Sequence, residues 1–517
     1  MSRTLTNDTQ LAYTIETSLG VAGTTWYNVE PNDITTFGAQ IGVTARNPIS
    51  ANRQAKKGSV TSLKSAMAYP TDLTRSSFRD HIEGFVFATG INSDVSDLVS
   101  TAAETTGDSY TVAALTAAQA NKMEIGTLIW ASNFSESSNN GLKEVDADIA
   151  TSATAISVAE NLVDEATAPA TARISFAGYR VQGASAVTWT WDSGTSRATM
   201  NLTGLGTQLI ALGLSAGQIV HIGSPNVAVT AIQNAFENAA ANDMYGHARV
   251  VSITADDVVF DGTDAALQFT DAVSPATDVD IIFGEFIRNV ATTSSEYLTR
   301  TFQYEATFVG LGTGSVDMYS YSKGNTCNSV TFNLPIESLA TIAYDWVGTD
   351  TDDPVLAASR KTGASAATNP PFTTGMNTSS EIARLRVIDV DESGLTTDFK
   401  SATLTLTNGA SEEVVLGTLG AKYINLGNFG VQLSTEVIFS ESTVINRIRG
   451  NTTVRMDFVL KNENGTIAVD IPSMTLGDGT PQFPRDESIK LTLTGTAYQD
   501  TTLGTSVGIS ISPVPLP

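Results

Sequence analysis

The sequence predicts a mainly β protein, and three observations lead to this prediction. Charged residues make up only 16% of the chain and Gly occurs 41 times, a composition typical of sheet-rich proteins with many turns. Short apolar–polar alternations recur along the chain between Gly and Asn turns. The single cysteine, Cys327, excludes an internal disulfide framework, so packing and ladder hydrogen bonds must stabilise the fold.

The first 90 residues contain a short alternation around Thr25–Val29 and then the best helix candidate in the chain, Asp72–Phe85. Thr71 or Asp72 follows Pro70 and can cap the helix N-terminus. The apolar residues of this segment fall near one face: Leu73, Phe78, Ile82 and Phe85. We therefore expect this helix to lie against the side of a sheet.

Residues 91–293 are predicted to form two related inserted modules, 91–184 and 185–293. Gly126–Trp130 in the first module corresponds to Gly217–His221 in the second. Each module offers several short strands with Gly or Asn turns, which favours a small β-barrel or sandwich. A helix-like stretch, Ala228–Ala240, accounts for the greater length of the second module.

From Ser294 onward the predicted strands lengthen and form two blocks, 294–350 and 381–517, separated by a Pro-, Ser- and Asp-rich linker at 351–380. Asn464-Gly465 between two apolar alternations is the strongest short hairpin signal in the chain. Ser440–Arg449 can form one short helix, and Ser488–Ala497 is predicted to be a final strand.

One stretch has an unusual charge pattern. The formal net charge of the chain is −25, yet residues 34–71 contain no Asp or Glu. The cations of this stretch are Arg46, Arg53, Lys56, Lys57 and Lys64. Complementary surfaces steer encounter and fix register, so the simplest partner is another copy of this acidic protein. We predict an assembly arm here, and the alternative is a solvated basic loop without a role.

The acidic balance also limits the other partners. Net negative surfaces repel the phosphate backbone, so tight nucleic-acid binding is disfavoured, whereas passive passage of DNA past an acidic wall is permitted. No apolar run approaches the ~18 residues needed to cross a bilayer, so no membrane partner is expected. The start of the chain lacks an apolar signal core, which indicates synthesis in a cytoplasm.

Catalytic and metal-binding patterns do not emerge from the sequence. The three histidines, His81, His221 and His247, occur in unlike contexts, and no HExxH motif or cysteine pair is present. Gly213-Leu-Ser-Ala-Gly217 matches the letters of a nucleophile elbow, but a strand-like segment follows Ser215 where the elbow needs a helix. We therefore expect no enzyme activity, no cofactor and no metal.

Several segments resemble a known family, the major tail tube proteins of long-tailed (siphovirus-type) bacteriophages. The resemblance covers roughly residues 20–90 and 294–517, and the insert 91–293 departs from the family pattern. The segments that carry it are Thr24–Pro31, Phe37-Gly-Ala, Thr44–Pro48, Asn52–Gly58, Pro70–Thr74, Phe483–Ala497 and Asp500–Gly504.

The resemblance implies a structural virion protein that forms stacked rings, a conduit for DNA ejection. It implies two tail-tube-type β-sandwich or barrel domains with a flanking helix, the first from 1–90 and 294–350 and the second from 381–517. A long loop, here Arg46–Gly58, would reach the neighbouring ring. Relatives with a duplicated tube domain assemble as trimers.

The resemblance also implies partners and a location. The partners would be further copies of the chain, the tape measure protein, and the tail terminator and distal tail proteins, with DNA only in passage. The protein would be assembled in the host cytoplasm and located in the viral tail of the virion.

Two other functions remain open at the level of sequence. A carbohydrate-binding or adhesive protein of the virion surface could use Trp130, Trp189 and Trp191 as stacking faces. Trp189 and Trp191 share one face of a strand, which indicates either a sugar platform or packing between modules. A hydrolase of cell-wall sugar lacks any catalytic constellation.

Overall fold

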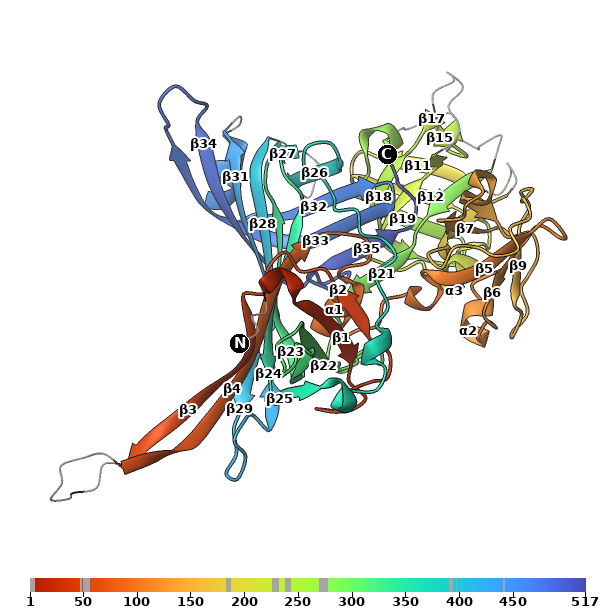
Figure 1. Cartoon of the computed structure of the whole chain (residues 1–517). Coiled ribbons are helices and arrows are strands. Elements are labelled where there is room, and N and C mark those ends of the chain that lie inside the picture. The colour runs from red at the N-terminus through yellow and green to blue at the C-terminus, as the bar shows by residue number, and fades with distance from the viewer. Residues whose placement is uncertain are drawn as a thin grey trace. The chain divides into compact units, whose positions relative to one another are not determined.

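The computed structural model describes residues 5–46, 49, 56–182, 187–225, 232–237, 243–268, 278–389, 394–396, 398–439 and 442–517. The protein is mainly β with antiparallel strand pairing, which confirms the predicted fold class (Figure 1). The chain forms two compact units. Unit 1 comprises Met1–Ala88, Tyr297–Gly375 and Ser401–Thr435, and unit 2 comprises Thr89–Glu296, Met376–Lys400 and Glu436–Pro517.

Unit 1 contains one α-helix and all or most of twelve strands. The helix is α1 (Arg79–Val86), and the strands are β1 (Gln10–Ile15), β2 (Tyr27–Val29), β3 (Thr36–Arg46), β4 (Lys56–Asp72), β22 (Phe302–Phe308), β23 (Met318–Leu334), β24 (Thr341–Gly348), β25 (Asp350–Leu356), β28 (Phe399–Thr407), β29 (Ser411–Glu413), β30 (Tyr423–Asn425) and β31 (Gly430–Ile438).

The main sheet of unit 1 runs in the order β3–β4–β24–β23–β28–β31. The first half of β23 pairs with β22 and β25 instead, and β1 joins β2 to β22. Alternate residues of β4 and β24 bury large rings on one face of the sheet, because successive side chains of a strand point to opposite faces.

An aromatic cluster forms the core of unit 1 around His81 of α1. The His81 ring stacks on Phe302 with centroids 5.5 Å apart, and its Nε2 lies 2.9 Å from the Tyr69 hydroxyl. The other rings within contact of His81 are Tyr13, Tyr304, Tyr344 and Trp346. The sequence predicted the burial of Phe78, Ile82 and Phe85 correctly, and it did not predict that a histidine would lie among them.

Helix α1 begins seven residues later than predicted. Asp72 is the last residue of β4, and the segment after it folds into a tight turn. In this turn the Ser77 amide donates to Thr74 Oγ1 and the Thr74 amide donates to Ser77 Oγ. These local side-chain bonds compete with helical ones, so the helix starts at Arg79. The helix packs against β23, which agrees with the expected position beside a sheet.

Unit 2 contains most of the predicted insert, whose 12-stranded sheet and two short helices have the following bounds. The elements are β5 (Leu98–Glu104), β6 (Ser109–Val112), α2 (Ala117–Ala120), β7 (Thr127–Ser132), β8 (Gly141–Glu144), β9 (Ala155–Ser157), β10 (Arg173–Val181), β11 (Thr188–Asp192), β12 (Arg197–Asn201), α3 (Gly206–Ala211), β13 (Ile219–Ile222), β18 (Gly246–Ile253), β19 (Asp257–Asp261) and β20 (Val279–Ile282). The small pairs β14 (Ser224–Pro225) with β15 (Ile232–Gln233), and β16 (Phe236–Glu237) with β17 (Asp243–Met244), lie outside this sheet.

The same pairings occur in both halves of the insert. Strand β7 pairs with β8 and β10, as β13 pairs with β18 and β20. Strand β6 joins β5 to β9, as β12 joins β11 to β19. Strands β10 and β20 pair with each other, so the two halves share one sheet.

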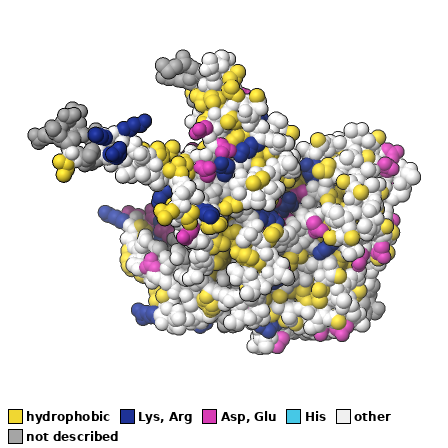
Figure 2. Space-filling view, turned by 90° about the horizontal axis from the view of Figure 1, so that it is seen from below, with side chains coloured by type: hydrophobic (Ala, Val, Ile, Leu, Met, Phe, Trp, Pro, Cys, Tyr) yellow, Lys and Arg dark blue, Asp and Glu magenta, His cyan; other side chains and the backbone are white. Residues whose placement is uncertain are grey.

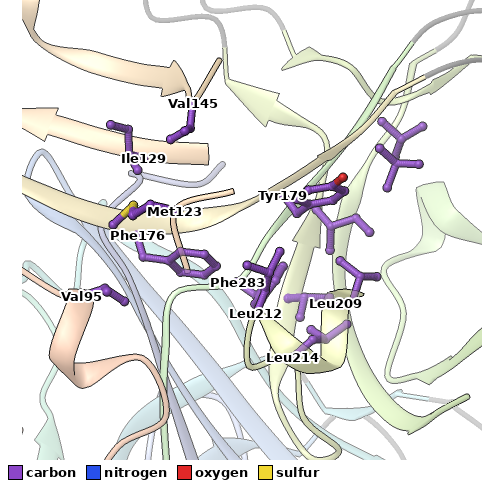
Figure 3. Packing of buried hydrophobic residues seen from close by; sticks show 14 of the residues in the cluster. Val95, Met123, Ile129, Val145, Phe176, Tyr179, Leu209, Leu212, Leu214 and Phe283 are labelled. Carbon is purple, nitrogen blue, oxygen red and sulfur yellow. The ribbon is translucent and has the colours of Figure 1, made fainter. Parts of the chain in front are cut away.

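A single buried cluster extends through both halves of the insert (Figure 3). The rings of Phe176 and Phe283 meet edge to face with centroids 5.4 Å apart. The expected helix at Ala228–Ala240 was wrong for residues 232–237, which form β15 and β16. The other residues of that stretch lie outside the described part of the chain.

The remaining part of unit 2 holds β21 (Glu285–Arg288), β26 (Ile382–Asp389), β27 (Gly394–Thr396), α4 (Thr443–Arg449), β32 (Thr453–Asn462), β33 (Gly465–Gln482), β34 (Lys490–Ala497) and β35 (Gly508–Ser512). Strand β32 pairs with β26 and β33, while β33 also pairs with β34 and β35. The hairpin predicted at Asn464-Gly465, the helix near Ser440–Arg449 and the strand near Ser488–Ala497 are confirmed. That strand is not the final one, because β35 follows it.

A buried ionic network joins the insert to these strands within unit 2. Asp457 of β32 accepts hydrogen bonds from Arg384 and Arg386, and Arg384 also reaches Asp264 of the insert. Arg249 of the insert bridges Asp261 and Asp470, with nitrogen–oxygen distances of 2.8 and 3.1 Å. Each of these charged groups has an opposite charge beside it, as burial requires.

The stretch expected to be a linker, 351–380, begins inside a strand. Its first residues belong to β25, which pairs with β23. The Lys323 ammonium lies 3.2 Å from Asp350 and 2.5 Å from Asp352, so these acids are held in ion pairs. The local composition predicted a solvated loop, because the lysine that pairs with these acids lies on another strand, β23, and is distant in the sequence.

Candidate assembly surface

The β3–β4 hairpin is the element that carries the predicted assembly arm. Residues 65–68 of β4 pair with β3 on one side and β24 on the other, and residues 69–72 pair with β24. Residues 56–64 of β4 pair with β3 alone among the described strands. The outer part of the hairpin is therefore a two-stranded ribbon that extends beyond its sheet (Figure 1).

Three of the predicted arm cations lie at the outer end of this ribbon. Arg46, Lys56 and Lys57 are exposed, and Arg46 lies directly opposite Lys56 in the strand register. Figure 2 shows Lys and Arg side chains gathered at the end of a projecting segment. Like charges placed opposite each other repel, so an anionic partner would stabilise this end of the hairpin. Arg53 lies outside the described residues.

Lys64 lies apart from the other cations, at the base of the free ribbon. Its ammonium is 3.9 Å from Glu412 Oε2 in the same unit, and its side chain is 69% exposed. An exposed pair at this distance contributes about 0–1 kcal/mol. Lys64 therefore has an acidic neighbour within its own chain, whereas the sequence predicted that all five cations would contact another subunit.

Exposed apolar side chains occupy the middle of the ribbon, and sequence reasoning missed them. Val43 and Val60 lie opposite each other in the register and are 63% and 50% exposed. Ile41 is 60% exposed. The alternation Ile41-Gly-Val43 is the signal that could have identified them, since apolar side chains on one face of a strand are expected to pack against another surface. The ribbon thus combines basic and apolar contacts.

A second hairpin also presents apolar side chains. Strands β29 and β30 lie in the connection between β28 and β31, and Val414, Leu416 and Tyr423 of this connection are exposed. The connection contacts the base of the ribbon, where the Leu63 amide donates to the Leu419 carbonyl at 3.0 Å. Sequence reasoning did not identify this hairpin.

One face of the unit 1 sheet carries few charges. The cross-strand rows on this face are Ala68–Asp345–Ser329–Thr407, Pro70–Ala343–Thr331–Thr405 and Asp72–Thr341–Asn333–Thr403. These rows contain two carboxylates and neither Lys nor Arg. The opposite face buries Tyr69, Tyr344 and Trp346, so this one is the partly exposed side of the sheet.

The tryptophans offered as sugar-stacking faces do not form an exposed platform. Trp189 is buried, stacks on Phe260, and donates from Nε1 to the Leu267 carbonyl at 2.9 Å. Trp130 is also buried. Trp191 is partly buried against the same core cluster as Trp189. Their packing role is therefore clear, and it leaves little ring surface for a sugar.

The histidine and cysteine groups that could support chemistry are buried in the described residues. The rings of His221 and His247 lie with centroids 4.8 Å apart, and His247 Nδ1 is 3.4 Å from Asp264 Oδ2, all in unit 2. The Cys327 thiol is buried, and burial raises its pKa well above the ordinary value. Ser215 precedes strand β13, as the sequence indicated. Within the described ranges, no three His, Cys, Asp or Glu side chains gather as a metal site. No helix found among those residues has the length and apolarity to cross a membrane.

Comparison with known families gives a match for this chain. Residues 252–497 match the family model of the phage tail tube protein. The match covers just under half of the chain, from β18 to the end of β34. It includes the second and third segments of unit 1 and does not include the β3–β4 ribbon. It supports a structural role in a phage tail tube, and hence in the tail of the virion. No curated protein matches the chain.

Proposed function

We propose that this protein is the major tail tube subunit of a bacteriophage and that its copies polymerise into stacked rings. The observation that carries the proposal is the β3–β4 ribbon, which leaves its own sheet and exposes both cations and valines. A chain with net charge −25 offers acidic surfaces to such a ribbon. The family match supports the same role from other residues.

A duplicated tube domain is the second part of the proposal. Strand β22 pairs with β1 and β23, as β32 pairs with β26 and β33. Strand β23 pairs with β24 and β25, as β33 pairs with β34 and β35. The parallel extends to the hairpin pairs β3–β4 and β28–β31, each followed by a helix.

Two tube domains in one chain support a ring of three copies, which supplies six domains. Closed rings leave no sheet edge exposed to further pairing. The partners would be other copies, a tape measure protein inside the tube, and the terminator and distal tail proteins at its ends. The insert at residues 91–293 would be an added outer decoration.

The tube would conduct DNA during ejection. The rows of small neutral side chains with Asp72 and Asp345 support this part of the proposal, if that face lines the lumen. Tight phosphate contacts need cations, and these rows have none. DNA would therefore slide along such a wall without sticking.

Electron microscopy of the purified protein tests the proposal. We expect hollow tubes, and we expect Lys56→Glu/Lys57→Glu to prevent stacking while the melting temperature stays unchanged. Arg197→Glu/Arg449→Glu is the matched control, because it changes charge equally at two exposed sites away from the ribbon. Normal tubes from the Lys56/Lys57 variant would remove the ribbon from the stacking contact. Wild-type protein that never forms tubes would contradict the function itself.

A further inference from the structure

Strands β3 and β33 each have an edge that is unpaired among the described residues. Strand β3 pairs with β4 on one side only. Strand β33 pairs with both β32 and β34 at Thr475, so these two strands lie on opposite edges of β33. Beyond Thr475 the pairing with β32 stops, and residues 476–482 pair with β34 alone.

The first part of β3, residues 36–42, lacks the features that protect isolated sheet edges, whereas the pairing with β4 shifts register at Gly42/Val43 and Thr44/Arg46. Natural edge strands are short, bulged, charged or interrupted by proline. Strand β3 is 11 residues long and contains no proline, and Arg46 at its end is its one charged residue. Ile41 and Val43 on this strand are exposed. An unprotected edge of this length calls for a regular partner strand.

The chain contains a template for that partner. Within unit 1, β28 pairs antiparallel with Ser329–Leu334 of β23, on the edge opposite β24. In the duplicated arrangement β28 corresponds to β3, and the outer half of β23 corresponds to residues 476–482 of β33. The pairing of β23 with β28 forms within one chain. Its counterpart, β33 with β3, does not form within one chain, so among the described strands β3 and residues 476–482 of β33 each lack a partner strand on one edge.

We propose that the free edge of β3 pairs antiparallel with residues 476–482 of β33 in a second copy of this chain. The proposal rests on the proposed tube function and names the strands that join one subunit to the next within a ring. Repetition of this pairing continues the sheet from copy to copy. Both unpaired edges are consumed at every junction, which is what ring closure requires.

The chemistry of the two edges suits this contact. Backbone amides and carbonyls provide the ladder, as in strand addition to an exposed edge. Thr480 and Gln482 are exposed, like Thr36 and Gln40 on β3. The register of β33 with β34 shifts between Asp478 and Thr480, where Asp478 and Gly479 have φ of 62° and 76°, so the added ladder is interrupted at this bulge. Pro481 supplies a carbonyl but no N–H donor, so the ladder has fewer potential donors than that of β28 on β23.

Cysteine cross-linking in assembled protein tests the strand assignment. Gln40→Cys and Thr480→Cys are placed together in one chain, and tubes are treated with a short bismaleimide before denaturing electrophoresis. Cys327 is buried and stays unreactive in the folded protein. Each single variant is a negative control. Thr331→Cys/Thr405→Cys is the positive control, because these directly opposed residues should link within one chain without raising its mass.

The expected result is covalent multiples of the 54.3 kDa chain from the double variant and monomer from both single variants. Normal tubes that yield only monomer from the double variant would overturn the strand assignment and leave the tube function intact. If the double variant forms covalent multiples but no tubes, and the wild type also forms no tubes, the result would support the edge pairing and contradict stacking of rings. Monomer without tubes would contradict both.

Discussion

At the scale of single residues, buried charges and histidines distinguish this protein from a simple packed β fold. Burial alone would raise the pKa of Asp457, but the Arg384 and Arg386 guanidinium groups lower it below its ordinary value. Removing one member of such a buried network leaves uncompensated charges, which is costly, although the intact network is not necessarily worth the same amount.

We therefore predict that Asp457→Ala lowers the free energy of unfolding by about 3–5 kcal/mol. Arg384 and Arg386 would keep their charge and lose their main acceptor. Asp353→Ala, at an exposed side chain, is the control and should change stability by less than ~0.5 kcal/mol. Chemical denaturation of both variants measures the difference. Equal small effects would mean that solvent reaches the network.

The histidines predict how stability depends on pH. Burial lowers the pKa of His81 to about 4, and burial with the neighbouring His247 lowers that of His221 to about 3. Below pH 6.5 the unfolded chain therefore binds protons that the folded chain does not, and the free energy of unfolding decreases as the pH is lowered. For His81 this loss is about 1.4 kcal/mol per pH unit and ends near its folded pKa.

His81→Phe should reduce this acid sensitivity. The Phe ring can keep the stack on Phe302, and it removes one titrating group. Denaturation at pH 7 and pH 5 gives the slope for the wild type and the variant. An unchanged slope would show that His81 is protonated in the folded protein at pH 5.

At the scale of elements, the sequence predicted strands, hairpins and the short helix α4 well, because each depends on neighbouring residues. It misplaced the start of α1, where the Thr74–Ser77 turn competes with the helix. It also missed the exposure of Ile41 and Val43, since a strand pattern does not tell which face finds a partner. The arm cations were identifiable from charge alone, whereas the pairing of Lys64 with Glu412 required the fold.

Helix α1 has little space where it meets β22. A Cβ added at Gly84 would lie 2.3 Å from Phe302 Cε2. Gly84→Ala would ordinarily stabilise a helix by about 0.5–1 kcal/mol. Here we expect a net loss of about 1–3 kcal/mol from overpacking, measured by urea denaturation. A gain in stability would show that the Phe302 ring moves aside freely.

The apolar part of the ribbon should contribute to assembly but not to folding. Val43→Ser/Val60→Ser shortens two apolar side chains that lie opposite each other on the ribbon and are 63% and 50% exposed. We expect an unchanged melting temperature and a higher critical concentration for tube formation, measured by sedimentation. Val99→Ser/Val163→Ser is the control, at two exposed valines of the insert. An equal rise in both variants would assign the effect to general solubility.

At the scale of the whole molecule, the fold class and the assembly hypothesis could be predicted from the sequence, while the pairing of distant segments required the structure. Strands β22–β25 and β32–β35 share the same pattern of strand pairing, and the amino-acid sequences of the two groups differ too much to reveal it. Likewise the ionic network joins Arg249 to Asp470, and no local pattern predicts such a pair.

The proposed duplication of the tube domain predicts the stoichiometry of the proposed ring. We expect native mass spectrometry of tube fragments dissociated in mild denaturant to give particles of three 54.3 kDa chains. Six tube domains in three chains would then surround one lumen. Particles of six chains would contradict the idea that both domains of each chain take part in the ring.

The pairing of β1 with β22 has a consequence for how the chain is made. Gln10–Ile15 finds Phe302–Phe308 only after the intervening residues have left the ribosome. Domains generally fold as units during synthesis, so the insert can fold while β1 still waits for its neighbour. Completion of unit 1 is therefore a late event, which would delay the proposed polymerisation until most of the polypeptide has been translated.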